Sequence, residues 1–200
     1  MAVETESFTA SDGTAITNVG SSIWTYAAGT SDHLFVTSNQ VRHKINTNST
    51  TIASRAGTFT DNQYAQITLK KVSVSQSYIG VAVRSSSGNA YWLYVSGTAY
   101  VLGKTISYGY NEIRVAGRTF NINDVLRLEV EGTTLRAIQN GATFWTATDS
   151  ELSTGKVGVS GAGTNVTDFN AADDWEGGDL VTAALQNFQY DWPHQLHARR

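Results

Sequence analysis

The sequence predicts an all-β fold of antiparallel strands, on the strength of three observations. Apolar and polar residues alternate in several short segments, an Asn-Gly pair separates two of them, and only one proline occurs in 200 residues. Alternation gives a strand one apolar face and one mixed face, as in antiparallel sheets that have one side in the core. All-β chains of this length are commonly one domain, so we expect a single core.

Strand signals are weak in the first part of the chain and clear from the middle onward. Short apolar stretches predict strands near residues 23–27, 33–36 and 40–45. Alternation is regular in three later segments, which are 64–72 (through Ile67 and Leu69), 78–84 (through Ile79, Val81 and Val83) and 125–132 (through Leu126, Leu128 and Val130). We expect about a dozen strands in total.

The segment NAYWLYV, residues 89–95, holds three aromatic residues between two turn-like segments. In a strand, Tyr91, Leu93 and Val95 share one face, and Trp92 and Tyr94 share the other. We expect the first set to lie in the core. For the second set three roles stay open: stacking on a sugar, contact with a partner protein, or cover for the outside of a sheet.

The clearest hairpin is centred on Asn140-Gly141, a pair that suits the two positive-φ positions of a type I′ turn. Counting outward from this turn predicts that Arg136 pairs with Trp145 and that Ala137 pairs with Phe144.

The last twenty residues differ in sequence pattern from the rest of the chain. Four apolar residues spaced four, three and four apart would form one stripe on a helix that Asp179 caps and Pro193 ends; they are Val181, Leu185, Phe188 and Trp192. We therefore divide the chain into a sandwich, 1–180, and an amphipathic attachment tail, 181–200, which is helical or extended. The tail packs either on its own sandwich or on another chain, and both alternatives stay open.

Six motifs, taken in order, resemble those of concanavalin A-like lectin and glucanase sandwiches of the laminin-G-like kind, which occur in bacterial and bacteriophage proteins. The motifs are DGT (12–14), DNQYAQITL (61–69), GVAVRSSSGNAYWLYV (80–95), DVLRLEVEGTTLRAIQNG (124–141), TDSELSTGKVGVSG (148–161) and DDWEGGDL (173–180). The resemblance covers most of residues 5–180. It implies a two-sheet antiparallel jelly roll with one sheet curved into a groove, a fold that serves lectins, glucanases, adhesion modules and virion proteins alike.

The resemblance raises the question of hydrolysis, which needs two carboxylates beside the glycosidic bond. Glu129 and Glu131 share a predicted strand face and are similar to part of the glucanase pattern Glu-x-Asp-x-Glu. Arg127, however, stands where that pattern has its first carboxylate. We expect surface charge neutralised by Arg127 or Arg84, no catalytic residue and no enzyme, with a glucanase-like hydrolase as the less favoured alternative.

Binding of a glycan or a protein partner needs only outward-facing aromatic and polar groups. On the predicted faces these are Arg84, Trp92, Tyr94, Arg127 and Glu129. The apolar stripe of the tail, Val181, Leu185, Phe188 and Trp192, is the predicted assembly interface.

The composition also excludes some classes of binding partner. A formal net charge of -3 gives no basic footprint for nucleic acid, and no apolar run approaches the length of a membrane span. The N-terminus has no signal-peptide pattern, so we expect synthesis in the cytoplasm. No cofactor or metal site is predicted; calcium is a weak candidate through scattered acids, namely Asp12, Asp149, Asp168, Asp173 and Asp174.

The leading hypothesis is a non-enzymatic structural or binding module, in particular a bacteriophage virion protein such as a head decoration, collar or tail-fibre component. It would be made in the host cytoplasm, form a homo-oligomer or bind other virion proteins, and touch cell-surface glycans. A free-standing carbohydrate-binding protein is the alternative.

Overall fold

The computed structural model describes residues 2–20, 23–29, 33–43, 47–74, 77–163 and 167–181. Within these residues the chain forms strands and one short 3-10 helix. The elements are β1 (Val3–Glu6), η1 (Ile16–Asn18), β2 (Trp24–Ala28), β3 (Leu34–Thr37), β4 (Gln40–His43), β5 (Thr47–Arg55), β6 (Gln63–Lys71), β7 (Ser77–Ser86), β8 (Asn89–Val95), β9 (Ala99–Ile106), β10 (Gly109–Gly117), β11 (Val125–Glu131), β12 (Thr134–Gln139), β13 (Ala142–Thr148), β14 (Lys156–Gly163) and β15 (Ala171–Asp179).

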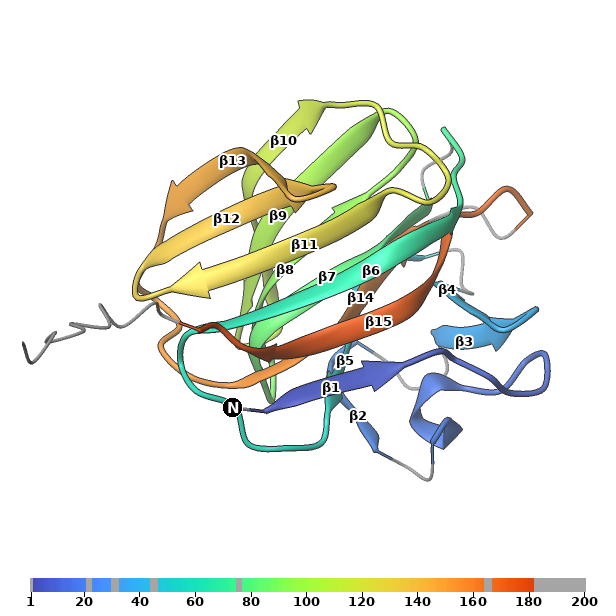
Figure 1. The fold of residues 1–200 in the computed structure, drawn as a ribbon, viewed down its shortest axis with the longest axis horizontal. Coiled ribbons are helices and arrows are strands. Elements are labelled where there is room, and N and C mark those ends of the chain that lie inside the picture. Colours follow the sequence, from blue (N-terminus) through green and yellow to red (C-terminus); the bar gives the residue numbers. More distant parts are fainter. Residues whose placement is uncertain are drawn as a thin grey trace, which may run out of the picture.

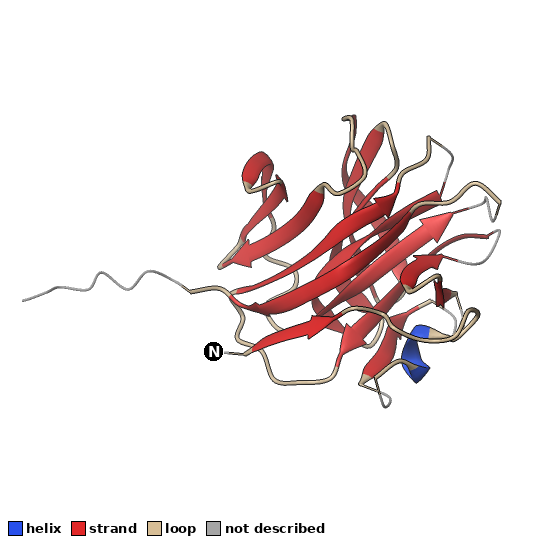
Figure 2. Cartoon of the chain, turned by 45° about the vertical axis from the view of Figure 1, so that its right-hand side comes forward, coloured by secondary structure: helices blue, strands red, loops and turns tan. Residues whose placement is uncertain are grey.

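The strands form two antiparallel sheets that face each other (Figures 1 and 2). The eight-stranded sheet has the order β13-β12-β11-β6-β15-β4-β3, with β1 also paired to β15; the seven-stranded sheet has the order β10-β9-β8-β7-β14-β5-β2. The chain crosses repeatedly from one sheet to the other, for example between β6 and β7 and between β10 and β11. This confirms the predicted all-β sandwich. The early strands β2, β3 and β4 lie close to their predicted positions.

The core lies between the sheets and is built from alternate side chains of both. Leu126, Leu128 and Val130 enter it from β11 and are fully buried. From the other sheet come the residues that share one face of β7 and β8: Val81, Val83, Tyr91, Leu93 and Val95. The predicted inner faces of these three strands are therefore confirmed.

The hairpin of β12 and β13 forms around Asn140-Gly141, both of which have positive φ (52° and 79°). The pairs next to the turn follow the predicted register. A bulge then shifts the rest by one residue, so that Ala137 pairs with Trp145 and Arg136 with Thr146. The two predicted pairs farther from the turn are therefore wrong.

The predicted tail can be followed only at its start. Leu185, Phe188, Trp192 and Pro193 lie outside the described residues, whereas Val181 is described and exposed. Asp179 ends β15, and its carboxylate accepts hydrogen bonds from the backbone amides of Ala2 (2.8 Å) and Thr60 (2.7 Å). In the described part of the chain, no helix has the length and apolar character needed to cross a membrane.

Candidate functional site

Trp92 and Tyr94 lie on the outer face of the seven-stranded sheet, as predicted, but they are buried. Their side chains are 0% and 2% exposed. They belong to a second apolar cluster, separate from the core between the sheets, whose other members are Ala27, Ala28, Ile52, Ala82, Ala90, Val101 and Ala162, with Tyr78 packed against them. Of the three roles left open for these two residues, the burial agrees with cover for the outside of the sheet, and Trp92 itself offers no exposed ring.

Trp92 is buried because a glycine and two tyrosines surround it. Its ring lies over Gly103 of the neighbouring strand, where an added Cβ would come within 2.2 Å of the ring. Its indole Nε1 donates to the Thr105 hydroxyl (3.0 Å). Tyr94 stacks on Trp92 at 4.4 Å between ring centroids, and Tyr110 stacks on it at 4.9 Å. Trp92 is thus the fixed support on which the two tyrosine rings rest.

A pocket of about 530 Å³ opens above this support. Its described lining is Tyr78, Tyr94, Val101, Tyr110, Glu112, Val115, Ala162 and Gly163. The edge strand β10 supplies Tyr110, Glu112 and Val115, and Tyr110 is 45% exposed. The pocket therefore presents an accessible aromatic ring, two further tyrosines and a carboxylate; we call it the tyrosine pocket.

The hydroxyl groups of the tyrosine pocket form a chain that ends on Glu112. Tyr94 donates to the Tyr110 oxygen (3.0 Å), and Tyr110 donates to Glu112 Oε1 (3.1 Å). The Thr50 hydroxyl lies 3.2 Å from that of Tyr94. Because a tyrosine hydroxyl has one proton, and that of Tyr94 goes to Tyr110, Thr50 is the donor in this contact.

Both tyrosine hydroxyls keep their protons in neutral solution. Burial raises the pKa of Tyr94 to about 12. Burial also raises the pKa of Tyr110, and the neighbouring Tyr94 and Glu112 raise it further. At neutral pH both hydroxyls therefore carry the proton that each donates along this chain.

The outer face of the eight-stranded sheet carries ion pairs over a groove of about 450 Å³. Arg127 Nε lies 2.7 Å from Glu129, and Arg136 Nη2 lies 2.8 Å from Glu131. Arg127 also lies over the Tyr64 ring, 3.6 Å from its centroid. Arg127 therefore neutralises Glu129, as expected, and the second arginine is Arg136 rather than Arg84.

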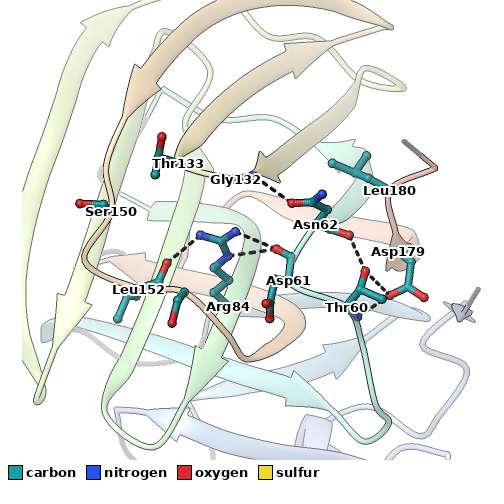
Figure 3. Close-up of a pocket in the computed structure, with 11 residues that line it drawn as sticks. Thr60, Asp61, Asn62, Arg84, Gly132, Thr133, Ser150, Leu152, Asp179 and Leu180 are labelled. Carbon is teal, nitrogen blue, oxygen red and sulfur yellow. Dashed lines mark hydrogen bonds between the residues drawn. The ribbon is translucent and has the colours of Figure 1, made fainter. Parts of the chain in front are cut away.

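Arg84 lies at one end of the sandwich, beside a polar pocket of about 660 Å³ (Figure 3). It occupies an irregular position in β7, with φ of 48°, and is 3% exposed. Its guanidinium donates to the carbonyls of Asp61 (2.9 and 3.1 Å) and Leu152 (2.7 Å). Burial lowers its pKa. Arg84 thus joins two loops, and these hydrogen bonds direct its guanidinium to backbone carbonyls rather than into the pocket.

The five predicted binding residues do not form one site. Trp92 and Tyr94 lie on the seven-stranded sheet, Arg127 and Glu129 lie on the other sheet, and Arg84 lies at the end of the sandwich. Tyr78, Tyr110 and Glu112, which line the tyrosine pocket, were not among the predicted site residues. Tyr110 and Glu112 alternate along GYNEIRV after a turn, and this pattern was the available signal.

The acidic residues considered for calcium are spread over the fold. Asp12 accepts a bond from the Ser38 amide, Asp149 binds Tyr91 and Lys104, and Asp174 pairs with Lys70. Asp168 accepts a bond from the Ser73 hydroxyl. Among the residues that the structure describes, no three metal-binding side chains come together.

The sheets and their order define a concanavalin A-like jelly roll, which confirms the resemblance seen in the sequence. No family model matches the sequence, and no match was found among the curated proteins. Many solved structures are similar in fold, and three of them are described below.

One of these is the β-glucanase of Bacillus licheniformis, with a TM-score of 0.59, 12% identity, and coverage of 90% of this chain and 99% of that one. Another is the carbohydrate-binding module CBM66 from Bacillus subtilis, with a TM-score of 0.54, 18% identity, and coverage of 78% and 92%. The third is the exoplasmic/lumenal domain of VIP36 with bound Ca²⁺ and Man3GlcNAc, with a TM-score of 0.54, 14% identity, and coverage of 80% and 85%. At these identities the likeness concerns the fold.

Proposed function

We propose that this protein is a non-enzymatic carbohydrate-binding module and that the tyrosine pocket is its site. The observation that carries the proposal is the half-exposed Tyr110 ring beside Glu112. Sugar sites combine an aromatic surface for the apolar face of the ring with a few polar groups that fix its orientation. The fold neighbours named for a carbohydrate-binding module and for a bound mannose oligosaccharide support the same class of ligand.

Binding would follow from the rigid support beneath the pocket. Trp92 is held by Gly103 and Thr105, so the stacked tyrosine rings are positioned before a ligand arrives. A pyranose ring can then lie against Tyr110 while one of its hydroxyls donates to Glu112. Such preorganisation reduces the side-chain entropy lost on binding.

Absence of hydrolysis is part of the proposal and rests on the carboxylates. Glycosidases act with a pair of them, and Glu112 is the one acid in the described lining of the tyrosine pocket. Glu129 and Glu131, on the other outer face, are held in ion pairs. A glucanase-like hydrolase is the second candidate, favoured by the fold of the β-glucanase. Release of reducing sugar from β-glucan by the wild-type protein, lost in Glu112→Gln or Glu129→Gln, would establish it instead.

The binding proposal is tested by titrating oligosaccharides into the wild type, Tyr110→Ala and Tyr108→Ala. Loss of the stacking ring should weaken binding by about tenfold or more, equivalent to about 1.4 kcal/mol. Tyr108 is the matched control, because it is equally aromatic, more exposed (66%) and outside the pocket lining. Equal affinity of Tyr110→Ala and wild type would place the site elsewhere, and the lack of any glycan binding by the wild type would end the proposal.

We propose further, from the sequence resemblance, that the module belongs to a bacteriophage particle made in the host cytoplasm. Many copies on one particle would strengthen weak sugar binding through avidity. The test is the solution mass, by light scattering, of the full chain beside a chain that ends at Leu180. Assembly of the full chain alone would support an attachment role for residues 181–200, of which the exposed Val181 is the first. Monomers in both cases would contradict it.

A further inference from the structure

The groups that face the tyrosine pocket are mainly hydrogen-bond acceptors. Tyr94 donates its proton to Tyr110, and Tyr110 donates its own to Glu112. What remains for a ligand is the lone pairs of these hydroxyls, the free oxygen positions of the Glu112 carboxylate, and the hydroxyl of Tyr78, which can donate or accept. Because acceptors predominate among these groups, a ligand that brings several hydrogen-bond donors fits the pocket best.

The charge of the pocket is negative. Glu112 is the one charged residue in its described lining. The cations on the neighbouring strands are engaged elsewhere: Arg114 lies over the Trp145 ring (4.7 Å), and Lys104 pairs with Asp149 (2.5 Å) and Glu151 (2.6 Å). An anionic group in the pocket would meet a carboxylate and tyrosine lone pairs without a compensating cation from these strands.

We propose that the tyrosine pocket selects neutral, hydroxyl-rich saccharides and excludes those that carry carboxylate or sulfate groups. This inference rests on the proposed function and names the ligand class of the same site. Sugar hydroxyls supply the donors that the acceptor-rich wall requires, and the apolar face of a neutral hexose fits the exposed ring of Tyr110.

The experiment compares matched pairs of tetrasaccharides that differ only at C6, where the neutral sugar has a hydroxymethyl group and its counterpart has a carboxylate. The probes are the β-1,4-linked tetramers of glucose, mannose and galactose, each beside its uronic-acid counterpart, titrated calorimetrically at low and at high salt. We expect at least one neutral tetramer to bind about tenfold or more tightly than its uronate, a difference that shrinks as salt screens the repulsion.

Two variants assign this selectivity to Glu112. Glu112→Gln keeps an oxygen that accepts from Tyr110 but removes the charge, so the uronate should now bind within about threefold of the neutral sugar. Glu131→Gln, which removes an acid from the opposite outer face, should leave the selectivity unchanged. Thermal unfolding of both variants checks that each is folded.

The outcomes separate the two proposals. Equal or tighter binding of a uronate by the wild type overturns this inference and leaves the carbohydrate-binding proposal standing. Selectivity that survives Glu112→Gln also overturns it, since the charge would then act from another position. Binding of none of the six probes overturns the proposed function and the inference together.

Discussion

Trp92 shows that a residue can face outward in a sheet and still be part of an apolar core. It is fully buried because the glycine across from it leaves room for its ring and because two tyrosines cover it. Substituting Trp92 by alanine would remove a buried aromatic, which typically costs about 3 to 5 kcal/mol of stability. Loss of sugar binding in Trp92→Ala would therefore reflect the loss of packing beneath the two tyrosine rings. Tyr110 is the better residue to substitute in a test of the binding site.

The close contact between Trp92 and Gly103 gives a prediction at a single residue. Gly103→Ala would place a methyl group against the buried indole, which must shift, and we expect a loss of about 1 to 3 kcal/mol in the free energy of unfolding, measured by urea denaturation. Gly117→Ala is the control, because the nearest atom to its added Cβ is an ordinary 3.7 Å away. Equal stability of the two variants would contradict the close packing.

At the scale of elements, a bulge in the β12–β13 hairpin accompanies the packing of one side chain, Phe144, against the core. Beyond the bulge the register shifts by one residue, and Phe144 packs against Tyr100 (4.9 Å) and Phe120 (6.1 Å), with Arg118 over its ring. The hairpin is thereby tied to the β10–β11 connection, which contains Phe120.

We expect Phe144→Ala to lower the free energy of unfolding by about 2 to 3 kcal/mol, since the side chain is partly buried in an aromatic cluster. The neighbouring Thr143 is exposed, so Thr143→Ala should change stability by less than about 0.5 kcal/mol. Chemical denaturation of both variants measures these changes in the free energy of unfolding. A loss in Phe144→Ala no larger than in Thr143→Ala would mean that the bulge does not anchor the hairpin.

Sequence patterns were sufficient wherever the cause of the structure is local. Alternation identified the inner faces of β7, β8 and β11, and the Asn140-Gly141 pair identified the hairpin turn. The same patterns did not predict the position of a side chain where contacts with distant strands or loops determine it. The burial of Trp92 depends on Gly103 and Tyr110 from two other strands, and the position of Arg84 depends on carbonyls in two loops. The tyrosine pocket combines side chains of five strands, so no single segment could reveal it.

At the scale of the whole molecule, we expect the change of stability in acid to depend on carboxylates that accept hydrogen bonds from other parts of the chain. Burial raises the pKa of Asp179, but hydrogen bonds from Thr60 and Ala2 outweigh it and lower the pKa overall. The same balance lowers the pKa of Asp149, held by Lys104 and Tyr91, and that of Asp124, held by Asn140 and Asn121. Each of these groups binds its proton more weakly in the folded state than in the unfolded state.

The sign of the pH dependence follows directly. A lowered folded-state pKa stabilises the protein above the unfolded value of about 3.9, and this stabilisation is lost as the pH falls through the folded-state pKa. We expect the free energy of unfolding to decrease from about pH 5 to about pH 2, and to decrease less steeply in Asp179→Asn. Thermal unfolding across this range is the measurement.

Asp173 provides a control of opposite sign. Burial raises its pKa, and among the described residues its Oδ1 has no hydrogen-bond partner. Its contribution is greatest below the unfolded pKa and is lost as the pH rises through the folded one, so Asp173→Asn should be at least as stable as wild type near neutral pH. If Asp173→Asn flattened the acid transition as Asp179→Asn is expected to do, the loss of stability in acid would not come from the lowered pKa values.

The pairing of β1 with β15 also determines how the molecule carries a pulling force. Ala2 and Asp179 exchange backbone and side-chain hydrogen bonds (2.9 and 2.8 Å), so both ends of this strand pair emerge at the same place. A pull applied between them opens the pairs Val3–Gly178, Glu4–Gly177 and onward one at a time, like a zipper, which requires little force. A pull along β15 is different, because β15 has β6 on one side and β1 and β4 on the other, and many backbone hydrogen bonds must break at once. We therefore expect little resistance to a pull between the start of β1 and the end of β15, and more resistance to a pull that shears β15 against its neighbours.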